Sequence, residues 1–124
     1  GLMALRLVKP GPVVMEYDKA VGSATPSGWQ TITFSGQVYQ TLPSGVWSVT
    51  LTGADCNGVR LYFRTAAAPS VNAFYLESAP VSSLQAPTVT ATLRINTGDR
   101  FFMQVNGEKP ETTLRYSATY LTPI

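Results

Sequence analysis

The stretch 93–105 reads Leu-Arg-Ile-Asn-Thr-Gly-Asp-Arg-Phe-Phe-Met-Gln-Val, and it decides the class of fold. Apolar and polar residues alternate before its Asn-Thr-Gly-Asp segment, and after that segment Phe101, Met103 and Val105 share one face. Because side chains alternate between the two faces of a β-strand, each flank can bury one face and expose the other. Glycine and aspartate favour the backbone conformations that a tight reversal needs. The stretch therefore predicts two strands joined by a turn, paired as a hairpin.

The same period-two alternation recurs along the rest of the chain. Threonine, valine and aromatic residues are frequent in these stretches, and such residues fit a pleated, half-buried surface. Ten glycines and nine prolines separate the stretches at short intervals, and helical periodicity is nearly absent. Several short strands at this spacing predict an antiparallel sandwich or barrel. The predicted strands cover residues 31–34, 47–52, 59–64, 89–95, 101–105 and 114–120.

The length of the chain, 124 residues, fits one domain that can bury a core without disulfides or a metal. We expect residues 13–124 to form a single sandwich domain, and residues 1–12 to be either a first strand or the junction with a fibrous stalk. The single cysteine, Cys56, excludes an intrachain disulfide, and we expect it to be a small loop or core residue. No apolar run is long enough to cross a bilayer, so stable membrane insertion is not expected.

Charge and residue types narrow the possible functions. Nine basic and seven acidic residues are scattered through the chain without a basic run, so nucleic-acid binding is not expected. The chain has no histidine, which excludes Ser-His-Asp and Cys-His catalysis and the usual zinc sites. A catalytic carboxylate pair stays open, although most of the acids fall in predicted turns or at strand ends. We expect a protein that is not an enzyme and that needs no cofactor or metal.

Arginines and aromatic residues on the predicted strands leave two interpretations open. The arginines alternate with apolar residues, so they belong either to a solvated outer face or to a subunit interface or anion site. The aromatic side chains belong either to the core or to an interface patch. Phe101 and Phe102 are adjacent and point to opposite faces, which suggests that something covers the outer face. The arginines are Arg60, Arg64, Arg94, Arg100 and Arg115, and the aromatic residues are Tyr39, Tyr62, Phe102, Tyr116 and Tyr120.

Three motifs, in this order along the chain, resemble the complement C1q-like and tumour-necrosis-factor-like family. Residues 42–49, Leu-Pro-Ser-Gly-Val-Trp-Ser-Val, are similar to the family's Pro-Gly-aromatic strand entry. The stretch 93–105 resembles its apolar strand, Gly-Asp turn and aromatic strand. Residues 116–121, Tyr-Ser-Ala-Thr-Tyr-Leu, resemble its closing strand, with alanine where glycine is usual. The resemblance covers about residues 30–124, and no collagen-like Gly-X-Y stalk is present.

The resemblance implies an all-β, antiparallel jelly-roll sandwich that assembles as a homotrimer. It also implies that the turn 96–99 faces a stalk, while the loops 53–58, 79–87 and 106–112 lie at the opposite, apical end. Loops on a rigid sandwich commonly carry recognition. We therefore expect the receptor-binding residues to be Asp55, Asn57, Asn106, Glu108 and Lys109, and the trimer interface to contain Tyr39, Tyr62, Phe102, Tyr116 and Tyr120.

Similar trimeric knobs cap phage tail fibres and tail needles. Low charge, abundant serine and threonine, and the lack of a disulfide or an Asn-X-Ser/Thr sequon fit such a knob. We expect a non-enzymatic knob at the tip of a phage tail, outside the cell and joined to an upstream fibrous stalk. It would attach to a bacterial surface glycan or protein, or help to penetrate the cell surface. Two alternatives stay open: a monomeric carbohydrate-binding module in which exposed Trp29 or tyrosines stack on sugars, and a C1q-like ligand domain of a cell-surface or secreted protein.

Overall fold

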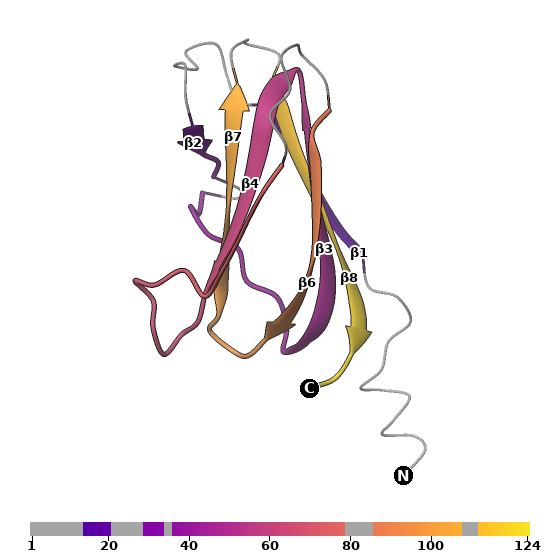
Figure 1. Ribbon diagram of the computed structural model, residues 1–124. Coiled ribbons are helices and arrows are strands. Elements are labelled where there is room, and N and C mark those ends of the chain that lie inside the picture. Colours follow the sequence, from indigo (N-terminus) through magenta and orange to yellow (C-terminus); the bar gives the residue numbers. More distant parts are fainter. Residues whose placement is uncertain (1–13, 21–28, 34–35, 79–85, 108–111) are drawn as a thin grey trace.

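The computed structural model describes residues 14–20, 29–33, 36–78, 86–107 and 112–124, with side chains from residue 29 onward (Figure 1). These residues contain no helix and form two four-stranded sheets in which every strand pair is antiparallel. The first sheet has the strand order β1-β8-β3-β6 and the second the order β2-β7-β4-β5. The strands are β1 (Val14–Ala20), β2 (Trp29–Thr31), β3 (Gly45–Ala54), β4 (Cys56–Arg64), β5 (Phe74–Glu77), β6 (Thr88–Ile95), β7 (Arg100–Gly107) and β8 (Thr113–Thr122).

Strands that are far apart in the sequence pair in a regular way. β1 pairs with β8, β2 with β7, β3 with β6 and β4 with β5. The first four strands therefore pair in reverse order with the last four, so that the chain folds back along itself at the connection between β4 and β5. Two further pairings, β3 with β8 and β4 with β7, join the ribbon into the two sheets.

The stretch 93–105 forms two strands and a turn as predicted, but the prediction that they pair as a hairpin is wrong. β6 belongs to the first sheet and β7 to the second, so the turn carries the chain from one sheet to the other. Gly98 has a φ of 89° there, and the Asp99 N–H donates to the Asn96 carbonyl oxygen at 3.0 Å. The sequence pattern could not reveal the difference, because paired strands and strands that face each other across a core both bury alternate residues.

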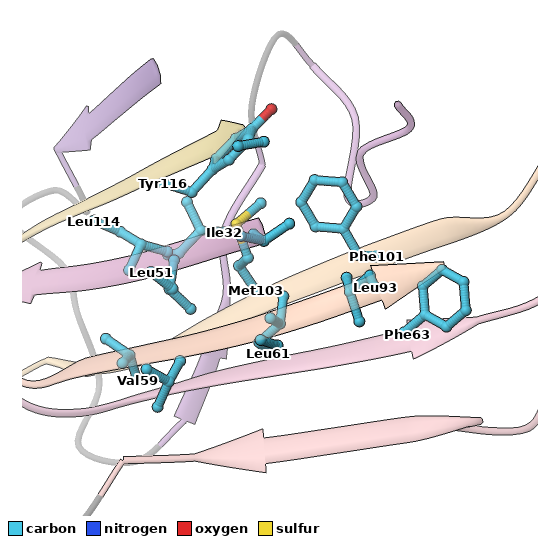
Figure 2. Packing of buried hydrophobic residues seen from close by; sticks show 14 of the residues in the cluster. Ile32, Leu51, Val59, Leu61, Phe63, Leu93, Phe101, Met103, Leu114 and Tyr116 are labelled. Carbon is cyan, nitrogen blue, oxygen red and sulfur yellow. The ribbon is translucent and has the colours of Figure 1, made fainter. Parts of the chain in front are cut away.

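The core lies between the two sheets (Figure 2). Along β3 and β6 burial alternates from residue to residue, which confirms the predicted pattern of inward apolar and outward polar positions. The rings of Phe101 and Tyr116 meet edge to face, with centroids 5.4 Å apart. Cys56 is completely buried in the same cluster, as expected for a core residue.

Tyr116 belongs to this core, so its predicted place in a trimer interface is wrong. Its side chain is only 1% exposed, and its hydroxyl donates to Oε1 of Gln40 at 3.1 Å. Leu114 and Ala118, two residues away on either side, are completely buried as well. All three share the inner face of β8, because side chains alternate along a strand. That face is already covered within one chain.

The connections divide between two ends of the sandwich (Figure 1). The β6–β7 turn lies at the same end as the C-terminus, and the short β3–β4 turn lies at the opposite end. Asp55 in the β3–β4 turn is exposed and has a φ of 56°, and the Thr112 hydroxyl donates to its carbonyl oxygen at 2.6 Å. The predicted N-terminal junction 1–12, most of the loop 79–87, and Glu108 and Lys109 lie outside the described residues.

Candidate binding face

The outer face of the second sheet gathers arginine and aromatic side chains in register. β4 and β7 place Arg60 opposite Gln104, Tyr62 opposite Phe102, and Arg64 opposite Arg100. The residues between them along β4, such as Leu61, point into the core and are buried. Alternation along two adjacent strands therefore builds one continuous row of outward side chains.

At one end of this row, Arg60 forms a closed network. Its Nε donates to Oε1 of Glu77 at 2.7 Å, and its guanidinium lies over the Trp29 ring, 3.6 Å from the centroid. The hydroxyl of Tyr75 donates to the same carboxylate oxygen at 2.6 Å. The hydrogen bonds from Tyr75 and from Arg60 lower the pKa of Glu77 below its ordinary value. This part of the face is electrically neutral, and Arg60 covers the Trp29 ring.

Toward the other end of the row, three aromatic rings pack against one another on the surface of the sheet. The rings of Tyr62 and Phe102 are parallel within 1°, with centroids 4.8 Å apart. Tyr39 packs against Phe102 at a tilt, with centroids 6.3 Å apart. Offset and tilted ring contacts of this kind stabilise a surface beyond the area they bury.

Two guanidinium groups lie over these rings. Arg64 is 5.1 Å from the centroid of Phe102 and 5.4 Å from that of Tyr62. Arg100 is 4.1 Å from the centroid of Tyr39. Each arginine therefore interacts with a ring face and is held in a defined position. We call these five residues the aromatic–arginine cluster.

The two arginines of the cluster carry charge that no ion pair with a described side chain neutralises. Like charges directly opposite each other on paired strands destabilise a sheet. Within the described residues neither Arg64 nor Arg100 makes an ion pair. Arg64 instead donates to two neutral acceptors, Oδ1 of Asn72 at 2.9 Å and the carbonyl oxygen of Pro69 at 3.4 Å. The cluster is thus a local concentration of positive charge.

The neighbouring carboxylate of Asp99 accepts backbone hydrogen bonds and, within the described residues, makes no ion pair with either arginine. It is 4% exposed, and each of its oxygens accepts a backbone hydrogen bond, from Ala66 at 2.9 Å and from Asn96 at 2.8 Å. These bonds tie the β6–β7 turn to the connection between β4 and β5. Asp99 therefore shapes the edge of the cluster.

A hollow of about 320 Å³ lies between these two connections. The loop after β4 and the β6–β7 turn form its walls, and both arginines of the cluster border it. Among the described residues that line it, none is acidic. They are Arg64, Thr65, Ala66, Pro69, Gly98 and Arg100.

The outer face of the first sheet has a different character. Apart from the exposed Arg94 and Arg115, short hydroxyl side chains occupy its rows, with Thr50 and Thr90 in contact through their hydroxyls at 3.1 Å and Thr88 donating to Thr52 at 3.3 Å. Ser48 lies in the middle of this face, paired in register with Thr92 and Thr119. Side chains this short allow another surface to approach the sheet closely.

The structure brings together part of each predicted site. Tyr39, Tyr62 and Phe102, expected at a trimer interface, gather in the aromatic–arginine cluster. Tyr120 lies apart from them, on β8, where its ring meets that of Trp47 edge to face at 5.4 Å. Whether any of these residues contacts another copy stays a prediction.

The predicted apical residues that the structure describes share one end of the sandwich. Asp55 and Asn57 flank Cys56, and Asn106 pairs in register with Gly58. Their assignment to receptor binding stays a prediction.

The sequence carried no signal for the loop residues Thr65 and Pro69, which line the hollow, or for Asn72, which accepts a hydrogen bond from Arg64. Alternation identifies strands only, so it gave no signal for this loop. The two arginines were singled out, but their direct opposition needs the register of β4 against β7, which the sequence does not contain.

Comparisons with protein-family models, curated proteins and solved structures give no match to this chain. Over the described residues, no helix has the length and apolar character to span a membrane. In that same part of the chain, no three histidine, cysteine, aspartate or glutamate side chains come together as a candidate metal site.

Proposed function

We propose that the two sheets form a jelly roll of the C1q/TNF-like type. A jelly roll contains eight strands in two Greek keys, in which the fourth strand of each key returns to lie beside the first. The pairing of β1 with β8, β2 with β7, β3 with β6 and β4 with β5 supports this proposal. This strand pairing is the one observation that carries the proposed function, because a jelly roll is the fold that the resemblance of the three sequence motifs implies.

The proposed assembly is a homotrimer, as the resemblance implies. In a ring of identical subunits, one surface of each copy meets a different surface of the next. The aromatic–arginine cluster is a poor choice for such an interface, since a neighbour would have to supply acidic groups. Among the acids whose side chains the structure describes, Asp99 is buried, Glu77 is paired with Arg60, and Asp55 lies at the opposite end of the sandwich from Arg64 and Arg100. We propose the hydroxyl-rich outer face of the first sheet, centred on Ser48, as one of the two surfaces that meet at each contact.

The proposed role is that of a non-enzymatic knob at the tip of a phage tail fibre or needle, which attaches to a bacterial surface glycan or protein or aids penetration. β1 begins at Val14, which pairs with Thr119 near the end of β8, and the β6–β7 turn lies at the end of the sandwich where β8 finishes (Figure 1). This arrangement supports a division of the sandwich into a shaft end, which an upstream stalk would join, and an apical end. Asp55 is exposed at the opposite end. Three weak apical sites on one trimer would combine through avidity.

The contacts of Trp29 give less support to the alternative that the chain is a carbohydrate-binding module. Such a module presents a bare aromatic ring on which a sugar can stack, and Trp29 or exposed tyrosines are the candidate rings, of which Trp29 is the less suitable. The face of Trp29 is covered by the Arg60 guanidinium at 3.6 Å, and Glu77 fixes that guanidinium from the side. A sugar would have to displace a charged, hydrogen-bonded group to reach the ring.

The proposed role can be tested with variants of the apical end. The triple variant Asp55→Asn, Asn57→Ser, Asn106→Ser should lose binding to bacterial cells and to arrays of bacterial surface glycans, while its molar mass stays that of the parent. Asparagine is chosen at position 55 because it tolerates the positive φ there. The matched control, Asn96→Ser with Thr97→Ala, changes polar side chains at the opposite end and should bind as the parent does. Unchanged binding of the triple variant would contradict the apical role.

A further inference from the structure

The aromatic–arginine cluster has the properties of a ligand site. Arg64 and Arg100 face each other across β4 and β7 with no acid paired to either one within the described residues. On their own, two like charges in this position cost stability. An anion held between them would turn the repulsion into two attractions.

The donors of both arginines are available for such an anion. A guanidinium carries five N–H donors in a planar fork that matches a carboxylate or a phosphate. Arg64 uses Nε on Asn72 and one terminal nitrogen on Pro69. No hydrogen-bond partner of the Arg100 guanidinium appears among the described residues, and its contact there is with the Tyr39 ring. The rings hold both forks in place, so little side-chain freedom remains to be lost on binding.

The space beside the arginines fits a small ligand. Both guanidinium groups border the hollow of about 320 Å³. Gly98 and Ala66, the two smallest residues among those that line it, leave room beside the arginines. A hollow of this size lies at the lower end of small-molecule sites. The carboxylate of Asp99 is 4% exposed and accepts two backbone hydrogen bonds, so it presents almost no accessible oxygen to an anion in the hollow.

We propose that Arg64 and Arg100 form an oxyanion site that takes a carboxylate or phosphate group carried on a small polar ligand. The site lies beside the β6–β7 turn, apart from the apical residues, and does not depend on the proposed knob function. Two sources share this chemistry: an acidic sugar, which offers a carboxylate, and a phosphorylated molecule.

The test is a titration of the ¹⁵N-labelled full chain, followed by amide chemical shifts at constant ionic strength. Sodium phosphate and sodium glucuronate are the two anionic probes, and glucose is the neutral one. At least one anion should give saturable shifts centred on Thr65, Ala66, Gly98 and Arg100, and glucose should give none. Saturation by glucuronate but not phosphate would identify the carboxylate source, and the reverse the phosphate source.

Charge-matched variants separate the site from general attraction to a basic protein. Arg64→Gln and Arg100→Gln should each weaken binding roughly 10-fold or more, because a hydrogen bond between charged groups is lost. Arg94→Gln removes the same charge from the other sheet, beyond the rows of serine and threonine, where Arg94 is exposed near the end of β6. It should leave the anion affinity unchanged, and light scattering checks that this variant assembles as the parent does. An equal loss in all three variants, or no saturable shift with either anion, would overturn the proposal. The same spectra report whether each variant is folded.

Discussion

Arg64 and Arg100 lie directly opposite each other on β4 and β7, and both guanidinium groups rest on aromatic rings. The rings and the neutral acceptors Asn72 and Pro69 hold the side chains in this pairing of like charges, which on its own costs stability. An anion that binds between them should therefore stabilise the folded chain. In thermal unfolding at matched ionic strength, the anion that binds in the titration should raise the Tm over that in chloride. The increase should vanish in Arg100→Gln and persist in Arg94→Gln.

Loss of the ring stack should destabilise the second sheet. Tyr62→Ala removes a half-buried ring stacked on Phe102, and we expect the free energy of unfolding to fall by about 2 kcal/mol. Urea denaturation measures the change. Val71→Ala is the control, because this side chain is 60% exposed and its truncation should have little effect. A Tyr62→Ala variant as stable as the control would contradict the structural role of the stack.

Asp99 should be essential for joining the β6–β7 turn to the loop after β4. Asp99→Ala leaves the backbone N–H groups of Asn96 and Ala66 without their acceptor, so the free energy of unfolding should fall by about 2–3 kcal/mol. Thr97→Ala, an exposed change in the same turn, should cost far less. Equal stabilities of these two variants in urea would show that the carboxylate does not hold the turn.

Cys56 should report on unfolding and on alkaline pH. Burial raises the pKa of its thiol above the ordinary value of 9.0. Above this value the folded state therefore keeps the proton that the unfolded state releases. The contribution of this thiol to the free energy of unfolding is fully present below pH 9 and is lost as the pH rises further. A thiol reagent should label Cys56 only as fast as the chain opens. Rapid labelling of the native protein at pH 8 would contradict this burial.

The interface of the proposed trimer can be tested at Ser48. A long charged side chain in the middle of a closely packed face would prevent another subunit from approaching it. Ser48→Arg should therefore dissociate the assembly to monomers in light scattering. Val71→Arg, which adds the same charge on the loop after β4, should not. A Ser48→Arg variant that assembles like the parent would exclude this face.

The sequence was sufficient to predict the five longer strands from β3 onward and most of the core, because burial at every second residue is a local property; β1 and the short β5 were not predicted, and the predicted strand 31–34 overlaps β2 only at Thr31. It predicted that Phe101 faces inward and Phe102 outward, which the structure confirms. It could not place β6 and β7 in different sheets, since partners across the core and partners within a sheet leave the same pattern. Tyr116 shows the related difficulty that an aromatic residue on a strand fits either a core or an interface.

The candidate site was less predictable than the fold. Arg64 and Arg100 were recognised individually as anion-site or interface candidates, but their opposition depends on a strand register set by the packing of the whole sheet. The loop that closes the hollow, with Thr65 and Pro69, has no periodic signal. Its position follows from the hydrogen bond between the Ala66 N–H and Asp99, two residues 33 positions apart in the chain.

The proposed knob function depends most on the assembly of a jelly roll as a homotrimer. Sedimentation equilibrium of the chain at micromolar concentration tests this assembly directly. We predict a single species with the mass of three copies of the 13.3 kDa chain. A species with the mass of one copy over the whole concentration range would contradict the proposed assembly, and with it the avidity on which the knob function depends.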